Sequence, residues 1–328
     1  MKGGGQYMTF FEVYDRWLDK HKADIKQSTV ATYYNLGKTF SRILDADADI
    51  CSLDADMMKA SFERFRDTGA SNHYIADLIR VFRMVMRYAG EDLGISNLPS
   101  IDWKIKDVVT ARVKDATRQR VKRFTIAEYE RMIKTFEEHP TPGRLAVVVT
   151  MFTGIRVGEA CGLKFSDIDF DEGVIHIQRT CVSIGKTIQK MLRPNEEYVR
   201  SRCLQSPKSA SSDRYIPMIP KLRKILQSYA KVYPGDYFVA TLSAEPTCTR
   251  TLRIWYGQML KAANVPYLNY HCLRHTFATQ MIEKGVDVKT VSSILGHAGV
   301  EITMDTYCHP SDDVKRAGIQ KAFKGLLK

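Results

Sequence analysis

The sequence predicts a mainly α-helical fold that also contains a small antiparallel β-sheet. Helical periodicity dominates residues 8–95, whereas the second half carries two short alternating segments, Gly173–Arg179 and Arg214–Ile219, and then returns to helical patterns. A chain of 328 residues is long enough for two domains, because one domain usually has roughly 100–200 residues. We therefore expect a helical domain followed by a mixed α/β domain.

The first domain is predicted to be a bundle of about four helices within residues 8–103. Apolar side chains recur with helical spacing from Thr9 to Leu18, from Met57 to Asp67 and from Asn72 to Tyr88. Ser28 is a residue type that favours the N-cap position, so a further helix is expected to begin there. No strand pattern interrupts these segments, and the bundle should be entirely helical.

A strongly basic stretch at residues 104–123 follows the bundle. We interpret it as an exposed interdomain linker, although a solvated helix would have the same composition. Its charge suits a path along a phosphate backbone. Its basic side chains are Lys104, Lys106, Arg112, Lys114, Arg118, Arg120, Lys122 and Arg123.

Residues 124–315 are expected to form the second domain. Thr125 and Glu128 have the spacing of a capping box at the start of a helix. The polar, basic segment Ser183–Ser212 lies between the two strand patterns, and we expect an extended hairpin with an insertion there. Further helices are predicted at Lys221–Val232, Thr249–Ala263, His271–Lys284 and Val288–Leu295, and a tail helix at 316–328.

The charge of the chain favours a polyanionic partner. Basic residues outnumber acidic ones by 49 to 37, a net charge of +12. Residues 1–121 carry 19 basic and 17 acidic side chains, whereas residues 122–328 carry 30 and 20. The excess therefore lies in the second half, and nucleic acid or an anionic membrane surface are the partners that it favours.

Membrane insertion and secretion are not indicated. The longest apolar run, near Leu145–Phe152, is far shorter than a membrane span. The seven cysteines are scattered and form no CxxC pair, which is typical of a reducing compartment. We expect a cytoplasmic protein.

Several common enzyme motifs are absent. Gly185-Lys186-Thr187 is similar to the end of a Walker A loop, but Thr180 stands where that loop requires glycine. The sequence has neither a GxGxxG nor an HExxH pattern. The sequence therefore contains none of these motifs of a nucleoside triphosphatase, a dinucleotide enzyme or a zincin.

Residues with chemistry gather near the end of the chain. His271, Arg274 and His275 share one helix face at i, i+3 and i+4, and His297 and Tyr307 follow. Zinc is an alternative reading of this region. Arg274 would oppose a nearby divalent cation, and the spacings match no structural zinc pattern; we expect no metal or cofactor. The possible zinc ligands would be His271, Cys272, His275, His297, Cys308 and His309.

Phosphoryl transfer explains these residue types together. Negative charge develops on the non-bridging oxygens of the reacting phosphate, and the forks of Arg156 and Arg274 suit that charge. A tyrosine hydroxyl is a nucleophile that can conserve the bond as a phosphotyrosine. A lysine or histidine can protonate the leaving oxygen. Such a site needs no metal if the arginines carry the charge.

The order and spacing of these segments resemble the tyrosine recombinases of the phage-integrase family. The resemblance covers residues 125–310, whereas the first domain is similar to the family's core-binding domain only in general character. Few residues precede the first helix, so we expect the simple two-domain type without an arm-binding domain. The matching segments are Thr153–Leu163 (TGIRVGEACGL), His271–Thr279 (HCLRHTFAT), Leu295–His297 (LGH) and Tyr307.

The resemblance implies a role for each matching position. Arg156 and Arg274 would grip the scissile phosphate, and Glu159 would hold the segment around Arg156. His297 would hydrogen-bond the phosphate, and Tyr307 would form a 3′-phosphotyrosine.

Proton transfer is assigned to two other positions. His271 would assist it, as a base toward Tyr307, while His275 is interpreted as a structural histidine. Lys208 would protonate the leaving 5′-hydroxyl, with Lys186 and Lys190 as open alternatives.

The resemblance also implies the assembly. The domains would close around double-stranded DNA as a C-shaped clamp, and monomers would form a homotetramer on paired core sites, linked by the tail 316–328. The reaction would be site-specific recombination through a Holliday junction, with a mobile element of bacterial or phage origin as the expected context. Supercoil relaxation of the type IB topoisomerase kind and a non-cutting DNA-binding regulator are the alternatives.

Overall fold

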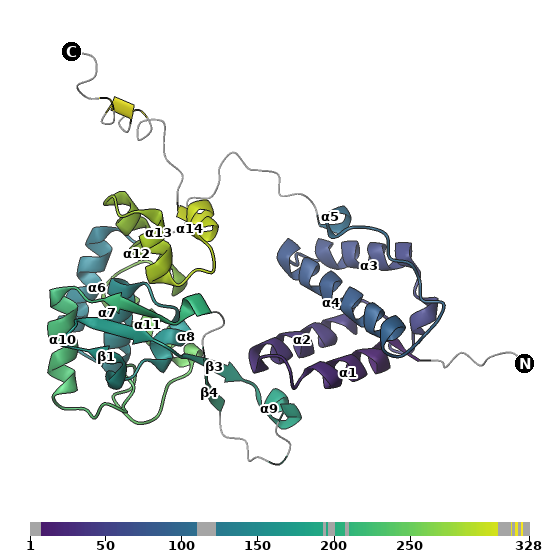
Figure 1. Ribbon diagram of the computed structural model, residues 1–328, viewed down its shortest axis with the longest axis horizontal. Coiled ribbons are helices and arrows are strands. Elements are labelled where there is room, and N and C mark those ends of the chain that lie inside the picture. Colours follow the sequence, from purple (N-terminus) through teal and green to yellow (C-terminus); the bar gives the residue numbers. More distant parts are fainter. Residues whose placement is uncertain are drawn as a thin grey trace, which may run out of the picture. The chain divides into compact units, whose positions relative to one another are not determined.

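The computed structural model in Figure 1 describes residues 8–109, 123–192, 195, 201–206, 210–307, 316, 319–320 and 323. The chain divides into two compact units. Unit 1 comprises Met1–Arg118 and Ile184–Ser201, and unit 2 comprises Gln119–Ser183 and Arg202–Lys328. The division falls within the predicted linker 104–123. The segment Ile184–Ser201 groups with unit 1, although the sequence places it inside the predicted domain 124–315.

The regular elements of unit 1 are helices, apart from Ile184 at the end of β3 (Thr180–Ile184) and Ser201 at the start of β4 (Ser201–Gln205). Its helices are α1 (Phe10–His21), α2 (Gln27–Phe40), α3 (Ala55–Asp67), α4 (Asn72–Glu91), α5 (Ile105–Val108) and α9 (Lys186–Leu192), with a 3₁₀ turn at Ile50–Ser52. Side-chain caps start several of them: the Thr9 hydroxyl accepts from the Glu12 N–H, and the Ser71 hydroxyl accepts from the Tyr74 N–H. The expected cap at Ser28 is wrong, because α2 begins at Gln27 and its N-cap is Lys26, two residues before Ser28.

Aromatic rings form the core of unit 1. Phe82 of α4 is fully buried and stacks on Phe10, with 5.5 Å between ring centroids, while Phe62 meets it edge-on at 5.7 Å. Aromatic pairs of this kind add stabilisation beyond their buried area. Gly37 allows α2 to approach α1, because a Cβ there would lie 2.7 Å from the Tyr14 ring.

Unit 2 combines helices with two small sheets. The strands β1 (Ile168–Asp169), β2 (Val174–Ile177) and β5 (Arg214–Pro217) form an antiparallel sheet in the order β1-β2-β5, and β3 (Thr180–Ile184) pairs with β4 (Ser201–Gln205). The expected hairpin with an insertion is confirmed: α9 lies between β3 and β4 in the chain. The helices of unit 2 are α6 (Ile126–Glu138), α7 (Pro142–Thr153), α8 (Val157–Gly162), α10 (Pro220–Ala230), α11 (Thr249–Ala262), α12 (His271–Glu283), α13 (Val288–Leu295) and α14 (Val300–Tyr307).

Helix α7 lies at the centre of unit 2, between α12 and α11 (Figure 1). The apolar run Leu145–Met151 is buried on all sides, as expected for a central helix. The Thr141 hydroxyl caps its start, and Gly154 ends it in a left-handed conformation, φ +65°. This end of α7 is where the candidate site begins.

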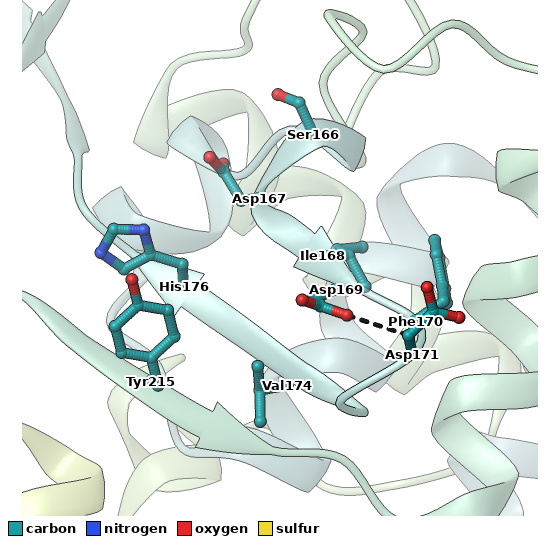
Figure 2. Close-up of a pocket in the computed structure, with 9 residues that line it drawn as sticks. All are labelled: Ser166, Asp167, Ile168, Asp169, Phe170, Asp171, Val174, His176 and Tyr215. Carbon is teal, nitrogen blue, oxygen red and sulfur yellow. Dashed lines mark hydrogen bonds between the residues drawn. The ribbon is translucent and has the colours of Figure 1, made fainter.

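The sheet has one buried and one open face. Ile175 and Ile216 pair across β2 and β5 and point into the core, whereas His176 and Tyr215 stack on the open face with 4.3 Å between centroids. Figure 2 shows this face and the aspartates beside it. These carboxylates already have local partners: Asp169 accepts from the Asp171 N–H at 2.9 Å, and the buried Asp167 is bound by Arg179.

No helix among the described residues is long and apolar enough to cross a membrane.

Candidate active site

The turn between α7 and α8 presents the first arginine of the site. Gly154 adopts φ +65°, and a Cβ there would lie 2.6 Å from the Phe277 ring, so only glycine fits. Arg156 then caps α8: its N–H donates to Glu159 Oε2 at 2.8 Å, and its guanidinium donates to Glu159 Oε1 at 2.8 Å. The Arg156 side chain retains 37% exposure. It is anchored on one side and open on the other.

Arg274 provides a second guanidinium from α12. Its side chain is almost fully buried, and two backbone carbonyls hold it: Gly154 O at 3.0 Å and Leu295 O at 2.8 Å. Burial, assisted by the charge of Arg156, lowers the pKa of Arg274 to about 9. It is therefore still cationic at neutral pH.

The turn after α13 supplies acceptors to both arginines. Leu295 O accepts from Arg274, and Gly296 O accepts from Arg156 Nη2 at 3.0 Å. Gly296 has φ +67°, and a Cβ there would lie 2.8 Å from Ser211 O and 3.0 Å from the Arg214 side chain. The glycine of the sequence Leu295-Gly296-His297 is thus required by conformation and by space.

A third arginine, Arg214 at the start of β5, belongs to the same cluster and was missed at the sequence level. It is 7% exposed and donates to Glu159 through Nη1 at 3.2 Å and Nη2 at 3.0 Å. Its Nε donates to Ile294 O at 2.6 Å. A signal was present in the alternation of the strand, because Arg214 is in phase with the buried Ile216, which places a cation on the core face.

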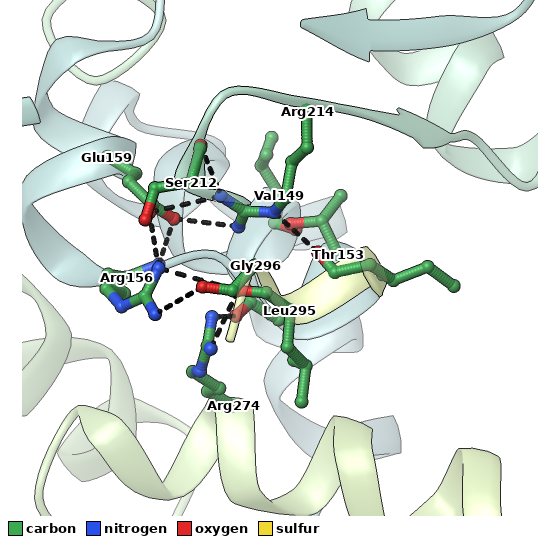
Figure 3. A network of polar contacts seen from close by, with 11 residues as sticks. Val149, Thr153, Arg156, Glu159, Ser212, Arg214, Arg274, Leu295 and Gly296 are labelled. Carbon is green, nitrogen blue, oxygen red and sulfur yellow. Dashed lines mark hydrogen bonds and ion pairs between the residues drawn. The ribbon is translucent and has the colours of Figure 1, made fainter. Parts of the chain in front are cut away.

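Figure 3 shows Arg156 and Arg214 meeting at the Glu159 carboxylate, while Arg274 and Arg156 donate to the backbone carbonyls of Leu295 and Gly296. Burial alone raises the pKa of Glu159, but the hydrogen bonds and charge of Arg214, and then the charge of Arg156, outweigh it and lower the pKa. With Glu159 ionised, three cations and one anion leave a net charge of +2. A buried excess of this kind is costly unless an anionic ligand completes it.

Tyr307 lies at the end of α14 beside this cluster. Its ring packs on a small apolar cluster that includes Ala278 and Val291, and its hydroxyl lies 2.7 Å from His275 Nδ1. Burial raises the pKa of Tyr307, while the charges of Arg274 and Arg156 counteract the rise. Arg274 and Arg156 are therefore close enough to Tyr307 for their positive charge to affect its pKa.

The two histidines of α12 lie differently with respect to Tyr307. His275, interpreted from the sequence as structural, contacts the Tyr307 hydroxyl, whereas His271 meets the His275 ring edge-on at 4.5 Å between centroids. Burial and the charges of His271 and Arg274 lower the pKa of His275 to about 4. The ring is neutral at pH 7, so Nδ1 accepts from the phenol when the ring proton is on Nε2.

His297 is fixed in orientation by α14. Its Nδ1 lies 2.7 Å from the Thr303 hydroxyl, and Thr303 is fully buried. Burial and the nearby Arg274 lower the pKa of His297 to about 4. When Nδ1 accepts from Thr303, the ring proton is on Nε2 and available to an anionic ligand.

Some of the remaining predicted residues are described by the structure, and the others are not. Lys106 lies in α5, and Arg123 pairs with Glu283; Lys104 is the N-cap of α5. Lys186 and Lys190, the alternatives to Lys208, both belong to α9 in unit 1. Lys208, Cys308, His309 and the linker residues Arg112, Lys114, Arg118, Arg120 and Lys122 lie outside the described residues.

Comparison with known families decides the affiliation. The model of the phage integrase family matches residues 122–313, more than half of the chain. The chain belongs to the phage integrase family. The match includes every residue of the arginine cluster and Tyr307, and the resemblance seen in the sequence is confirmed.

Curated relatives of the chain are tyrosine recombinases. The protein named tyrosine recombinase XerC-like from Caldanaerobacter subterraneus subsp. tengcongensis is 27% identical over 263 residues, covering 76% of this chain and 65% of the relative. Tyrosine recombinase XerA from Pyrococcus furiosus is 29% identical over 211 residues, covering 62% and 64%. The chain thus spans less than two thirds of the length of these two relatives.

Solved structures of integrases share the fold. The Tn1549 transposon integrase in complex with transposon right end DNA superposes with a TM-score of 0.75 at 22% identity, over 96% of this chain and 99% of that chain. A lambda integrase dimer bound to a core site gives 0.62 at 20% identity, over 93% and 80%. The expected fold class, mostly helical with small antiparallel sheets, is confirmed.

Proposed function

We propose that this member of the phage integrase family cleaves and rejoins DNA strands, with Tyr307 as the nucleophile. The observation that supports it most strongly is the cluster of three arginines, in which Arg156 and Arg214 share the Glu159 carboxylate and Arg274 is held by backbone carbonyls, beside the partly buried phenol of Tyr307. A cluster with excess positive charge and a nearby nucleophile suits a phosphodiester anion. The scissile phosphate of DNA would supply the missing negative charge.

The reaction would proceed by two transesterifications. The Tyr307 oxygen attacks phosphorus and forms a bond to it, the bond to the 5′-oxygen breaks, and that oxygen takes up a proton. A 3′-phosphotyrosine results, and attack by a 5′-hydroxyl reverses the same steps. Arg156 and Arg274 would stabilise the charge on the non-bridging oxygens, and His297 Nε2 would donate to one of them.

Proton transfer assigns distinct roles to the histidines. His275 is in contact with the Tyr307 hydroxyl at 2.7 Å, so it is the group placed to accept the phenol proton. His271, on the same helix, would assist proton transfer during the reaction. Burial and the charges of Arg274 and Arg156 lower its pKa. Lys208 remains our proposal for the acid that protonates the leaving oxygen.

We also propose site-specific recombination for a mobile element as the biological outcome. Its support comes from similarity alone: integrase structures that share this fold include the Tn1549 transposon integrase with DNA and a lambda integrase tetramer bound to a Holliday junction, TM-score 0.61. A homotetramer on paired sites is the corresponding assembly. Tetramers and Holliday junctions on paired sites would separate this outcome from supercoil relaxation by a monomer.

A nicked suicide DNA substrate tests cleavage directly. Covalent protein–DNA adducts should form in EDTA and without ATP, and Tyr307→Phe should abolish them. Tyr215→Phe is the matched control, because Tyr215 is 63% exposed on the open sheet face of the same unit, and it should cleave like the wild type. Adducts in the Tyr307→Phe variant would contradict the assignment of the nucleophile.

The tail 316–328 is proposed to dock on a neighbouring protomer. Ile319 and Phe323, two of its described residues, are 63% and 58% exposed. Truncation after residue 315 should preserve binding to a single site and impair recombination between paired sites. Equal loss of both activities would contradict this role.

A further inference from the structure

Arg214 has more contacts inside the cluster than a simple salt bridge needs. Its guanidinium donates to both oxygens of Glu159, to Ser212 O at 3.0 Å and, through Nε, to Ile294 O. All three nitrogens of its guanidinium donate to protein acceptors, and two of them bind the Glu159 carboxylate. A role in holding other groups is therefore the one that its position allows.

Glu159 is shared between two arginines in a symmetrical way. Oε1 accepts from the guanidinium groups of Arg156 and Arg214, and Oε2 accepts from the Arg156 N–H and from Arg214. The carboxylate orients Arg156, but a carboxylate bound to Arg156 alone would also cancel its charge. Arg214 supplies a second cation to the same carboxylate.

We propose that Arg214 is a positioning residue that compensates the charge of Glu159, so that Glu159 can orient Arg156 without neutralising it toward the phosphate. This inference rests on the proposed function, because it concerns the phosphate that Arg156 would bind. Arg214 acts through Glu159 and Arg156 and touches no reacting atom.

The charge of the cluster makes the proposal quantitative. Arg156, Arg214, Arg274 and Glu159 carry +2 together. Arg214→Met would leave +1, whereas the double variant Arg214→Met/Glu159→Gln would return the cluster to +2 with only Arg156 and Arg274. Removing a second buried partner should therefore restore activity, which a purely structural role of Arg214 would not produce.

The first test measures the rate of covalent adduct formation on the nicked suicide substrate at saturating DNA. We expect Arg214→Met to slow it by roughly 100-fold, the scale for losing one preorganised electrostatic group, and the double variant to be faster than Arg214→Met. Arg214→Lys, which keeps a cation, should fall between wild type and Arg214→Met. A double variant no faster than Arg214→Met, or Arg214→Lys as slow as Arg214→Met, would overturn the proposal.

A matched control separates charge compensation from folding. Arg179 pairs with Asp167, another buried carboxylate of unit 2, which also accepts from Gln178 at 2.8 Å. Arg179→Met and Arg214→Met should both lower thermal stability, but Arg179→Met should leave the cleavage rate per folded molecule unchanged. Equal slowing in both variants would show that loss of packing explains the effect.

A neutral substrate provides a second readout. With a methylphosphonate at the scissile position one negative oxygen is gone, so the effect of Arg214→Met should be much smaller than on the phosphate, for both stereoisomers. An equal loss on the two substrates would overturn the proposal. Failure of the wild type to form any adduct would refute the proposed function instead, so the two failures are distinguishable.

Discussion

The helical unit 1 and the arginine cluster of unit 2 use different interactions to hold their large buried side chains. In unit 1 Phe10, Phe62 and Phe82 are buried against one another, and local caps start the helices. In unit 2 Arg214 and Arg274 are nearly as inaccessible, and they are held by carbonyl groups and one carboxylate from distant segments. The first arrangement maximises stability, whereas the second keeps charge in place for a ligand.

The largest effect should follow from Arg274→Met. We expect adduct formation to slow by roughly 100- to 1000-fold, the range for removing one stabilising donor. The free energy of unfolding should change little, because a buried cation without a carboxylate of its own contributes weakly to stability. Single-turnover cleavage and thermal unfolding measure the two quantities. If Arg274→Met were severely destabilised but its folded fraction cleaved normally, Arg274 would serve stability and not chemistry, contrary to the comparison.

Phe82→Ala tests the other side of the contrast. This ring is fully buried against Phe10 and Phe62, so its removal should cost about 3–5 kcal/mol of unfolding free energy. Met84→Ala on the same helix is the control, since Met84 is 38% exposed, and the change there should stay within about 0.5 kcal/mol. Denaturant titration of both variants measures the difference, and similar values would argue against an aromatic core.

Gly296→Ala should affect stability and chemistry together. Its left-handed φ of +67° and the contact of a new Cβ with Ser211 O should cost roughly 1–3 kcal/mol. Because Gly296 O also accepts from Arg156, cleavage should slow in the folded protein as well. Gly257→Ala, where a Cβ meets nothing within 4 Å, is the control in α11. Normal cleavage by Gly296→Ala would show that the turn at Gly296 is not needed to position Arg156.

Ser71→Ala removes the cap of α4 in unit 1. The Tyr74 N–H loses its acceptor at 3.2 Å, and the loss should be about 1 kcal/mol. The effect should appear as a shift of the denaturation midpoint with an unchanged cleavage rate at saturating DNA. A slower chemical step would mean that unit 1 contributes to more than stability.

The last prediction concerns pH. The pKa of His275 falls from 6.5 to about 4 on folding, so the unfolded chain takes up a proton that the folded protein does not. The contribution is complete above pH 6.5 and is lost as the pH falls toward 4. His275→Gln should therefore flatten the acid decline in stability across this window. An unchanged slope would show that His275 is not held neutral.

The sequence predicted best what depends on neighbouring residues. The helix at Val288–Leu295 was predicted with its correct ends, because Asp287 caps it and Gly296 stops it within the same short segment. The end at Tyr307 was harder: α14 was not predicted, since only one of its residues, Thr303, is buried. Its helical form depends on packing against α13, which no local signal contains.

The candidate site shows the same limit. Arg156 and Arg274 were found because their segments resemble a known family, whereas Arg214 lies 55 residues from the carboxylate that it binds. His275 was interpreted as structural from the family resemblance, and its contact with Tyr307, 32 residues away in the chain, is set by the tertiary fold. The identity of a residue is visible in the sequence, but the partner that defines its role is set by the tertiary fold.

The backbone carbonyl groups that hold the arginines also separate two tasks. Leu295 O and Gly296 O fix Arg274 and Arg156 without cancelling their charge. The electrostatic attraction at the site is therefore the same for every phosphodiester. Phosphates are the same at each step of a duplex and carry no sequence information. If the proposed function holds, the choice of target is made elsewhere on the protein, and a new target can evolve while the cutting centre stays as it is.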